Sequence, residues 1–157
     1  MAQEMRVAVR DGVRAALAST PEILYVAAAG NDHSEITFQE NLWASMNDLP
    51  NLMVVGAVDE AGSQAGFTNF GPAVTVYANG SQVESYIPGG ERMKMSGTSM
   101  AAPNVTNLAA KLLALEPSLK PADVIKLIRD GSDLSKDGRF RLINPKRSVE
   151  LLQARRR

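Results

Sequence analysis

The chain has 157 residues, and its 17 basic residues are balanced by 17 acidic ones. This balance, together with an aromatic content of 5%, excludes the basic field and the base-stacking surface of a nucleic-acid-binding protein. Cysteine is absent, which excludes disulfide bonds and thiolate metal sites but leaves the cellular compartment open. No apolar run approaches the ~20 residues that cross a bilayer, so we expect no membrane partner.

The first third of the chain alternates between helical and extended patterns. Apolar residues at helical spacing (Val9, Val13, Ala16, Leu17) predict a helix over residues 3–18 that ends at Thr20-Pro21. Two continuous apolar runs, Ile23–Ala29 and Leu52–Val58, are typical of buried strands in a parallel sheet. The polar segment between them is long for a loop, and we expect Trp43, Met46 and Leu49 to anchor it. No hairpin signal joins the strands, so the pattern favours α/β architecture.

The remainder of the chain predicts three short strands followed by three helices. The strands fall between turn residues, at Val74–Tyr77, Gln82–Tyr86 and Arg92–Met95. The first helix is expected from near Thr98 to about Leu115, and the second starts with Pro121 at its first position and is stopped by Gly131. A polar connector over 132–141 leads through Leu142–Pro145 to a final short helix that reaches Ala154. We find no internal repeat and no interdomain linker, and we therefore treat residues 1–157 as a single domain.

Ser99 begins the first of these helices, within the segment Ser96–Pro103. Gly97 permits a close backbone approach, and the alanines that follow the serine leave its hydroxyl accessible. A serine at a helix N-terminus also lies at the positive end of the helix dipole, which stabilises an anion formed beside it. We place Pro103 within the first turn, where its missing N–H costs little. The pattern indicates a nucleophilic serine.

Asn31 is the second candidate, because Ala27–Asn31 places an amide just past the end of a central strand, where ligands bind in open α/β sheets. Acyl transfer through a serine needs donors aimed at the oxygen that becomes negative. We expect the Ser99 N–H and the Asn31 amide to form this oxyanion hole, with the Thr98 hydroxyl as a further donor. Considered alone, each segment could have a purely structural role. Ala27–Asn31 could be a strand that ends in a turn, and the segment of Ser99 could be a capped helix start.

Taken together, the two segments resemble the subtilisin-like serine proteases, or subtilases (the peptidase S8 family). Ala27–Asn31 matches the family's oxyanion-asparagine segment, and Gly97–Pro103 matches its catalytic-serine motif. Three further segments follow the family's order and approximate spacing, namely Val54–Val58, Phe67–Gly71 and Ile87–Gly89. The resemblance implies a subtilisin-like three-layer α/β sandwich with a mostly parallel sheet, represented here by its C-terminal portion only.

The resemblance also implies how the site works. Ser99 and Asn31 would be catalytic, while Ala28, Ala29, Gly30 and Thr98 would contact a peptide or protein substrate. The family's aspartate and histidine segments, and one wall of its specificity pocket, belong upstream of residue 1, so we expect this chain alone to be inactive. The only histidine, His33, fits an exposed loop residue better than a replacement base.

The resemblance has consequences beyond the catalytic residues. No cofactor is evident, and structural calcium is expected only in a full-length parent. Family resemblance suggests a secreted or periplasmic protein. Because half of the sheet is missing, an exposed edge strand predicts self-association of the fragment.

Two other functions remain open at this level. The chain could be a non-catalytic subtilase-like binding or scaffold module, or a pseudoenzyme whose upstream part lacks the base. A serine esterase on another fold is disfavoured, because no Gly-x-Ser-x-Gly elbow surrounds Ser99.

Overall fold

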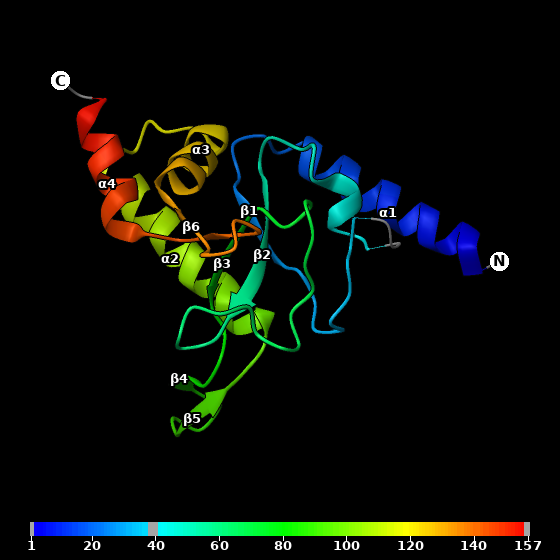
Figure 1. The fold of residues 1–157 in the computed structure, drawn as a ribbon. Coiled ribbons are helices and arrows are strands. Elements are labelled where there is room, and N and C mark those ends of the chain that lie inside the picture. Colours follow the sequence, from blue (N-terminus) through cyan, green and yellow to red (C-terminus); the bar gives the residue numbers. More distant parts are fainter. Residues whose placement is uncertain (1, 38–40, 156–157) are drawn as a thin grey trace.

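A five-stranded sheet organises the chain in a computed structural model that describes residues 2–37 and 41–155 (Figure 1). Its strands lie in the order β1 (Tyr25–Ala28), β2 (Leu52–Val58), β3 (Val76–Asn79), β7 (Arg141–Leu142) and β6 (Asp133–Leu134). Neighbouring strands run parallel from β1 to β7, and only β6 is antiparallel to its neighbour. The predicted α/β class with a mostly parallel sheet is therefore confirmed.

Helices cover the sheet unequally. The set comprises α1 (Ala2–Ala18), α2 (Thr98–Leu115), α3 (Pro121–Gly131), α4 (Pro145–Ala154) and a short 3-10 helix η1 (Ala44–Met46). Figure 1 shows α2, α3 and α4 gathered on one side of the sheet and α1 extending away from the other. A separate antiparallel hairpin, β4 (Val83–Tyr86) with β5 (Arg92–Met95), projects from the body just before α2. Among the described residues, no helix has the length and apolarity required to cross a membrane.

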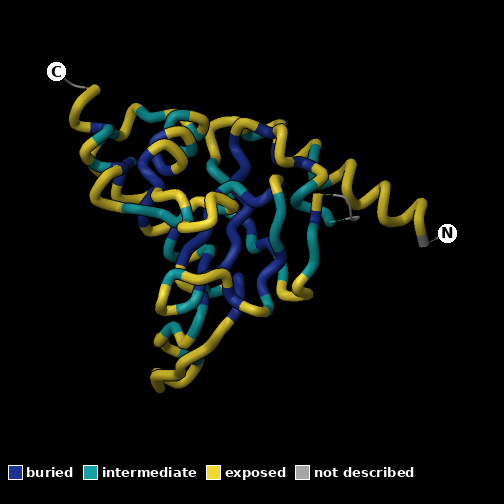
Figure 2. The backbone as a smooth tube through the Cα atoms, in the orientation of Figure 1, coloured by how far each residue is buried: buried dark blue, intermediate teal, exposed yellow. Residues whose placement is uncertain are grey.

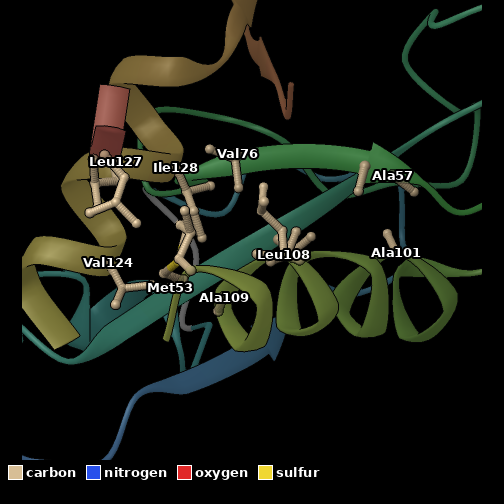
Figure 3. Close-up of a cluster of buried hydrophobic side chains, with 14 of the residues drawn as sticks. Met53, Ala57, Val76, Ala101, Leu108, Ala109, Val124, Leu127 and Ile128 are labelled. Atoms are coloured by element: carbon tan, nitrogen blue, oxygen red, sulfur yellow. The ribbon is translucent and has the colours of Figure 1, made fainter. Parts of the chain in front are cut away.

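Strand β2 lies at the centre of the core and is buried at every position (Figure 2). Side chains alternate along a strand, so Met53, Val55 and Ala57 pack against α2 and α3 on one face (Figure 3). Val54 and Val58 point to the opposite face, where Ile36, Ala73, Val74 and Tyr77 cover them. Val124, Leu127 and Ile128 form the apolar stripe of α3, and all three are buried against this face of the sheet. The sheet thus has packed layers on both faces.

Asn51 fixes the C-terminal end of helix α1 to the body of the protein. Asn51, 2% exposed, places its side-chain nitrogen 3.0–3.2 Å from the carbonyl oxygens of Leu17, Thr20 and Ile23. Leu17 is buried there, whereas Val9 near the other end is 52% exposed. The predicted helix is confirmed, and its apolar face is packed against the core at Val13 and Leu17 but exposed at Val9.

Three sequence expectations need correction. Strand β3 starts two residues later than predicted, because the Thr75 hydroxyl, not a backbone carbonyl, accepts the hydrogen bond from Val54 N, at 3.0 Å. The first strand is shorter than predicted, because Ile23 N donates to Thr20 O and closes a turn. Since α2 begins at Thr98, Pro103 lies beyond the first turn, and the helix lacks one hydrogen bond there.

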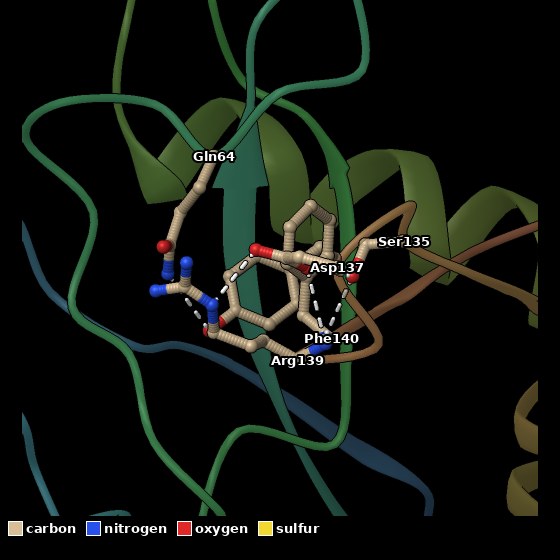
Figure 4. Close-up of polar contacts among 6 residues, drawn as sticks. Gln64, Ser135, Asp137, Arg139 and Phe140 are labelled. Atoms are coloured by element: carbon tan, nitrogen blue, oxygen red, sulfur yellow. Dashed lines mark hydrogen bonds and ion pairs between the residues drawn. The ribbon is translucent and has the colours of Figure 1, made fainter.

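The polar connector over 132–141 contains the short strands β6 and β7, which the sequence did not predict. Each is two residues long, too short for a periodicity signal. The turn between them is closed by side chains, with Ser135 Oγ donating to Asp137 Oδ1 at 2.6 Å and accepting from Phe140 N at 3.1 Å (Figure 4). This turn places the centroid of the Phe140 ring 4.8 Å from that of Tyr77. Phe140 thereby packs on the face of the sheet to which Val54 and Val58 point.

Candidate active site

Ser99 is the second residue of α2, and it is exposed at the end of the helix that faces the hairpin. The preceding Gly97 is buried, and its N–H donates to Gly80 O at 2.8 Å. The two glycines approach so closely that a Cβ on Gly80 would lie 2.6 Å from the Gly97 carbonyl oxygen. The end of β3 therefore determines where α2 starts and where Ser99 is presented.

Asn31 follows β1 and is joined to α2 through Thr98. The Asn31 side-chain oxygen accepts from Thr98 N at 2.8 Å and from Thr98 Oγ1 at 2.9 Å. Thr98 is fully buried, and its hydroxyl also accepts from Gly30 N at 3.2 Å. The hydroxyl is thus engaged with the loop after β1 and orients the Asn31 amide.

Two N–H groups remain available beside the nucleophile. Within the described residues, neither the Ser99 N–H nor the Asn31 side-chain NH₂ has a hydrogen-bond partner. The first is one of the unpaired donors of a helix start, and the second lies across the amide from the oxygen that Thr98 holds. Both donors are at the positive end of the α2 dipole, so the arrangement suits a negatively charged oxygen.

The predicted substrate-binding residues differ in exposure. Ala28 and Gly30 are half-buried, and Gly30 adopts a φ of 103°, a conformation that favours glycine. Ala29 is 1% exposed and packs in the interior with Ile36 and Val54. The substrate-binding roles of these residues remain predictions.

His33 is exposed, as expected from its loop position. The backbone N–H of His33 donates to Phe67 O at 3.0 Å, and the centroid of its ring lies 5.6 Å from the ring centroid of Phe70. No hydrogen bond links His33 to Ser99 among the described residues. The described residues hold no group of three His, Cys, Asp or Glu side chains that could bind a metal ion.

Two residues at this site received no role from the sequence. Gly80 belongs to the turn residues, Asn79-Gly80, between two predicted strands, although its close approach to Gly97 sets the start of α2. Asn69 belongs to the Phe67–Gly71 segment, and the structure places its side chain against the loop that carries Asn31. The Asn79-Gly80 pair could have indicated that Gly80 occupies a special backbone position. A single asparagine in a turn-rich segment gives no such indication for Asn69.

This combination of a parallel α/β sheet, a serine at a helix start and a nearby free amide defines the serine-hydrolase class of site. The family model described as the subtilase family matches residues 2–143, and the chain belongs to that family.

Relatives and solved structures agree with this assignment. Subtilisin-like protease 1 of Trichophyton rubrum is 42% identical over 104 residues, which are 66% of this chain and 20% of that protein. The structure of the self-cleaved protease domain of PatA matches with a TM-score of 0.73 and 27% identity, covering 89% of this chain and 54% of that one. A cold-adapted subtilisin-like serine proteinase matches with a TM-score of 0.67 and 28% identity, covering 77% and 44%. The chain therefore spans about a fifth of its fungal relative and about half of these structural neighbours.

Proposed function

We propose that this chain supplies the nucleophile-and-oxyanion half of a subtilase active site, in a parent protein that hydrolyses peptide bonds. Ser99 Oγ attacks the carbonyl carbon of the substrate, and the carbonyl oxygen takes up negative charge. The Ser99 N–H and the Asn31 side-chain NH₂ hydrogen-bond that oxygen. The observation that carries the proposal is the pair of hydrogen bonds from Thr98 to the Asn31 oxygen, which leaves the NH₂ group free.

Among the described residues no basic side chain hydrogen-bonds to Ser99, so we assign the base that takes its proton to the parent protein. In the parent, an upstream histidine takes the proton and passes it to the leaving amine, and an upstream aspartate orients the histidine. The substrate is a peptide or protein whose residue before the scissile bond lies along Ala28, Ala29 and Gly30. We assign any structural calcium to the full-length parent, and we expect the parent to be a secreted or periplasmic protein.

The isolated 157-residue chain should show negligible peptidase activity. The test is turnover of a general peptide substrate by the chain and by Ser99→Ala, with Ser96→Ala as the matched control. Ser96 is an exposed serine of the same segment whose hydroxyl accepts from Gln82 N at 2.9 Å. Hydrolysis that Ser99→Ala abolishes and Ser96→Ala preserves would refute inactivity of the isolated chain. In the parent protein, by contrast, we expect Ser99→Ala to abolish hydrolysis and Ser96→Ala to preserve it.

The proposal includes self-association of the isolated chain through the α1 side of the sheet. Strand β1 is at the edge of the sheet, and Met5 and Val9 on α1 are 62% and 52% exposed. Sedimentation velocity should detect dimers that increase with concentration, and Val9→Glu should reduce them. Leu134→Glu, at an apolar residue 58% exposed on β6, is the control that should leave them unchanged. A single monomeric species at high concentration counts against the proposal.

A further inference from the structure

Asn69 is a buried asparagine that contacts the Asn31 loop on both sides of Asn31. Its side chain is 2% exposed, and its Oδ1 atom accepts hydrogen bonds from Asp32 N and Ser34 N, both at 3.0 Å. Its Nδ2 atom donates to Ala29 O at 2.9 Å. These three hydrogen bonds use both ends of one amide to hold the backbone before and after the oxyanion donor.

The backbone of Asn69 adds a fourth contact, because its N–H donates to Gly30 O at 2.9 Å. The described residues give the Asn31 side chain hydrogen bonds to Thr98 only. Asn69 therefore contacts the loop from Ala29 to Ser34 at four of its residues, beside the backbone hydrogen bonds from His33 N to Phe67 O and from Phe70 N to Ser34 O. Thr98 orients the amide at the tip of the loop.

The loop requires such support because two of its residues have positive φ angles. Gly30 has a φ of 103° and His33 a φ of 49°, and the second value is uncommon for a residue with a side chain. Such conformations persist when surrounding contacts hold them, and the two hydrogen bonds to Asn69 Oδ1 flank His33. A Cβ on Gly30 would lie 2.5 Å from Asn69 Nδ2, so the glycine also makes room for the asparagine.

Asn69 is itself attached to the centre of the sheet. The adjacent Thr68 is fully buried, and its hydroxyl accepts from Ala57 N at 2.9 Å and donates to Asn69 O at 3.0 Å. A hydrogen-bonded path thus runs from β2 through Thr68 and Asn69 to the loop. A site supported in this way by a rigid strand is held more accurately than one on a free loop.

We propose that Asn69 is a positioning residue for Asn31, which sets the loop so that the Asn31 NH₂ group is held at the oxyanion position. The proposal rests on the proposed function, because the placement of Asn31 affects catalysis only if Asn31 is the oxyanion donor. Asn69 touches no substrate in this scheme and acts entirely through the loop.

The first test measures hydrogen exchange in the unmodified 157-residue chain. The amide protons of Asp32 and Ser34 should exchange at least about tenfold more slowly than that of Gly66, after correction for intrinsic rates. Gly66 is an exposed glycine whose N–H has no partner among the described residues. Exchange of Asp32 and Ser34 at the rate of Gly66 would overturn the proposal without any substitution.

The second test compares Asn69→Ser with Asn51→Ser. Asn51 is the matched control, since it is also 2% exposed and also binds backbone carbonyls, but at the end of α1. Asn69→Ser should accelerate exchange of Asp32 and Ser34 about tenfold and shift the NMR resonances of the Asn31 side-chain NH₂. Asn51→Ser should leave both unchanged once the rates are corrected for global stability. Unchanged Asn31 resonances in Asn69→Ser, or the same shift in Asn51→Ser, would overturn the proposal.

Kinetics in the parent separate this inference from the proposed function. Asn69→Ser should lower kcat and leave KM nearly unchanged, and it should add little to the effect of Asn31→Ala in the double variant. Additive losses, or a change in KM alone, would contradict positioning through Asn31. If Asn31→Ala leaves kcat unchanged while the NMR results hold, the proposed function fails and the structural role of Asn69 stands.

Discussion

The side-chain oxygen of Asn31 accepts two hydrogen bonds from Thr98, one from its backbone N–H at 2.8 Å and one from its hydroxyl at 2.9 Å. Thr98 immediately precedes Ser99, so one buried residue connects the end of β1 to the start of α2. The connection orients the amide, because an oxygen held by two donors keeps the NH₂ group on the other side. The relative position of nucleophile and donor thus depends on Thr98.

Thr98→Val removes the hydroxyl while keeping the shape of the side chain. It deletes one hydrogen bond to Asn31 and leaves Gly30 N without its acceptor, so we expect the free energy of unfolding to fall by about 1–3 kcal/mol. Urea unfolding measures this change. Thr98→Ser, which retains the hydroxyl, should recover most of the loss. Thr106→Val, at an exposed threonine of the same helix, should change stability by less than about 0.5 kcal/mol. Equal effects of the two valine variants would contradict the assigned role of Thr98.

Asn31→Ala in the parent should slow kcat by about 10²–10³ with little change in KM, a magnitude carried over from subtilisin. The substitution removes one of two donors to the oxyanion. Because this hydrogen bond forms only as negative charge develops in the transition state, its loss lowers kcat and hardly affects substrate binding. Asn107→Ala, at an exposed residue of α2, is the control and should retain full activity. A normal kcat in Asn31→Ala would mean that another group donates to the oxyanion.

Local sequence signals predicted the helices of this fold better than its strands. The observed ends of α2 and α3 lie within about one residue of the predicted ones, because Gly97 and Pro121 mark the starts and Gly131 marks the end of α3. The apolar pattern of α1 was equally clear, but it could not show that Val9 would be half exposed. Periodicity identifies a face of a helix and does not identify what covers it.

At the candidate site too, the sequence indicated individual residues but not the contacts between them. Asn31 and Ser99 could be selected from two motifs and a family resemblance, but the atom that joins them belongs to Thr98, 67 residues from Asn31. The support from Asn69 spans 40 residues to Ala29, and no local pattern marks it. Long-range hydrogen bonds of this kind arise from the arrangement of the strands, which a single sequence does not specify.

Gly80→Ala should destabilise the fold at the start of α2. The added Cβ would lie 2.6 Å from Gly97 O and 2.7 Å from the Ala57 Cβ, and neither atom belongs to a side chain that can swing away. We expect a loss of about 1–3 kcal/mol in the free energy of unfolding, together with a shift of the Asn31 side-chain resonances.

Gly12→Ala is the matched control for that substitution. Gly12 lies in the interior of α1 with no atom within 4 Å of an added Cβ, so alanine should stabilise the helix by about 0.5–1 kcal/mol. Urea unfolding of both variants should give midpoint shifts of opposite sign. Shifts of the same sign would contradict the steric argument for Gly80.

The buried phenol of Tyr77 should make the protein sensitive to alkaline pH. Tyr77 is 3% exposed and packs on Gly56 and Phe140, and burial raises the pKa of its hydroxyl from 10.0 to about 12. Between these values the unfolded chain loses the proton while the folded chain keeps it. Stability therefore falls as pH rises through this range, by roughly 2–3 kcal/mol in all. Below pH 10 the contribution is fully present.

Tyr77→Phe tests this prediction, because it removes the ionisable group and keeps the ring. The variant loses the 3.4 Å hydrogen bond from Gln64 Nε2, so its stability at neutral pH should be slightly lower (Figure 4). Its free energy of unfolding should nevertheless decline less steeply between pH 10 and 12 than that of the unmodified chain, as measured by urea unfolding at each pH. Tyr86→Phe, at a tyrosine 66% exposed on the hairpin, is the control variant for removing a phenol hydroxyl outside the core. A parallel decline in Tyr77→Phe and the unmodified chain would assign the alkaline transition to other groups.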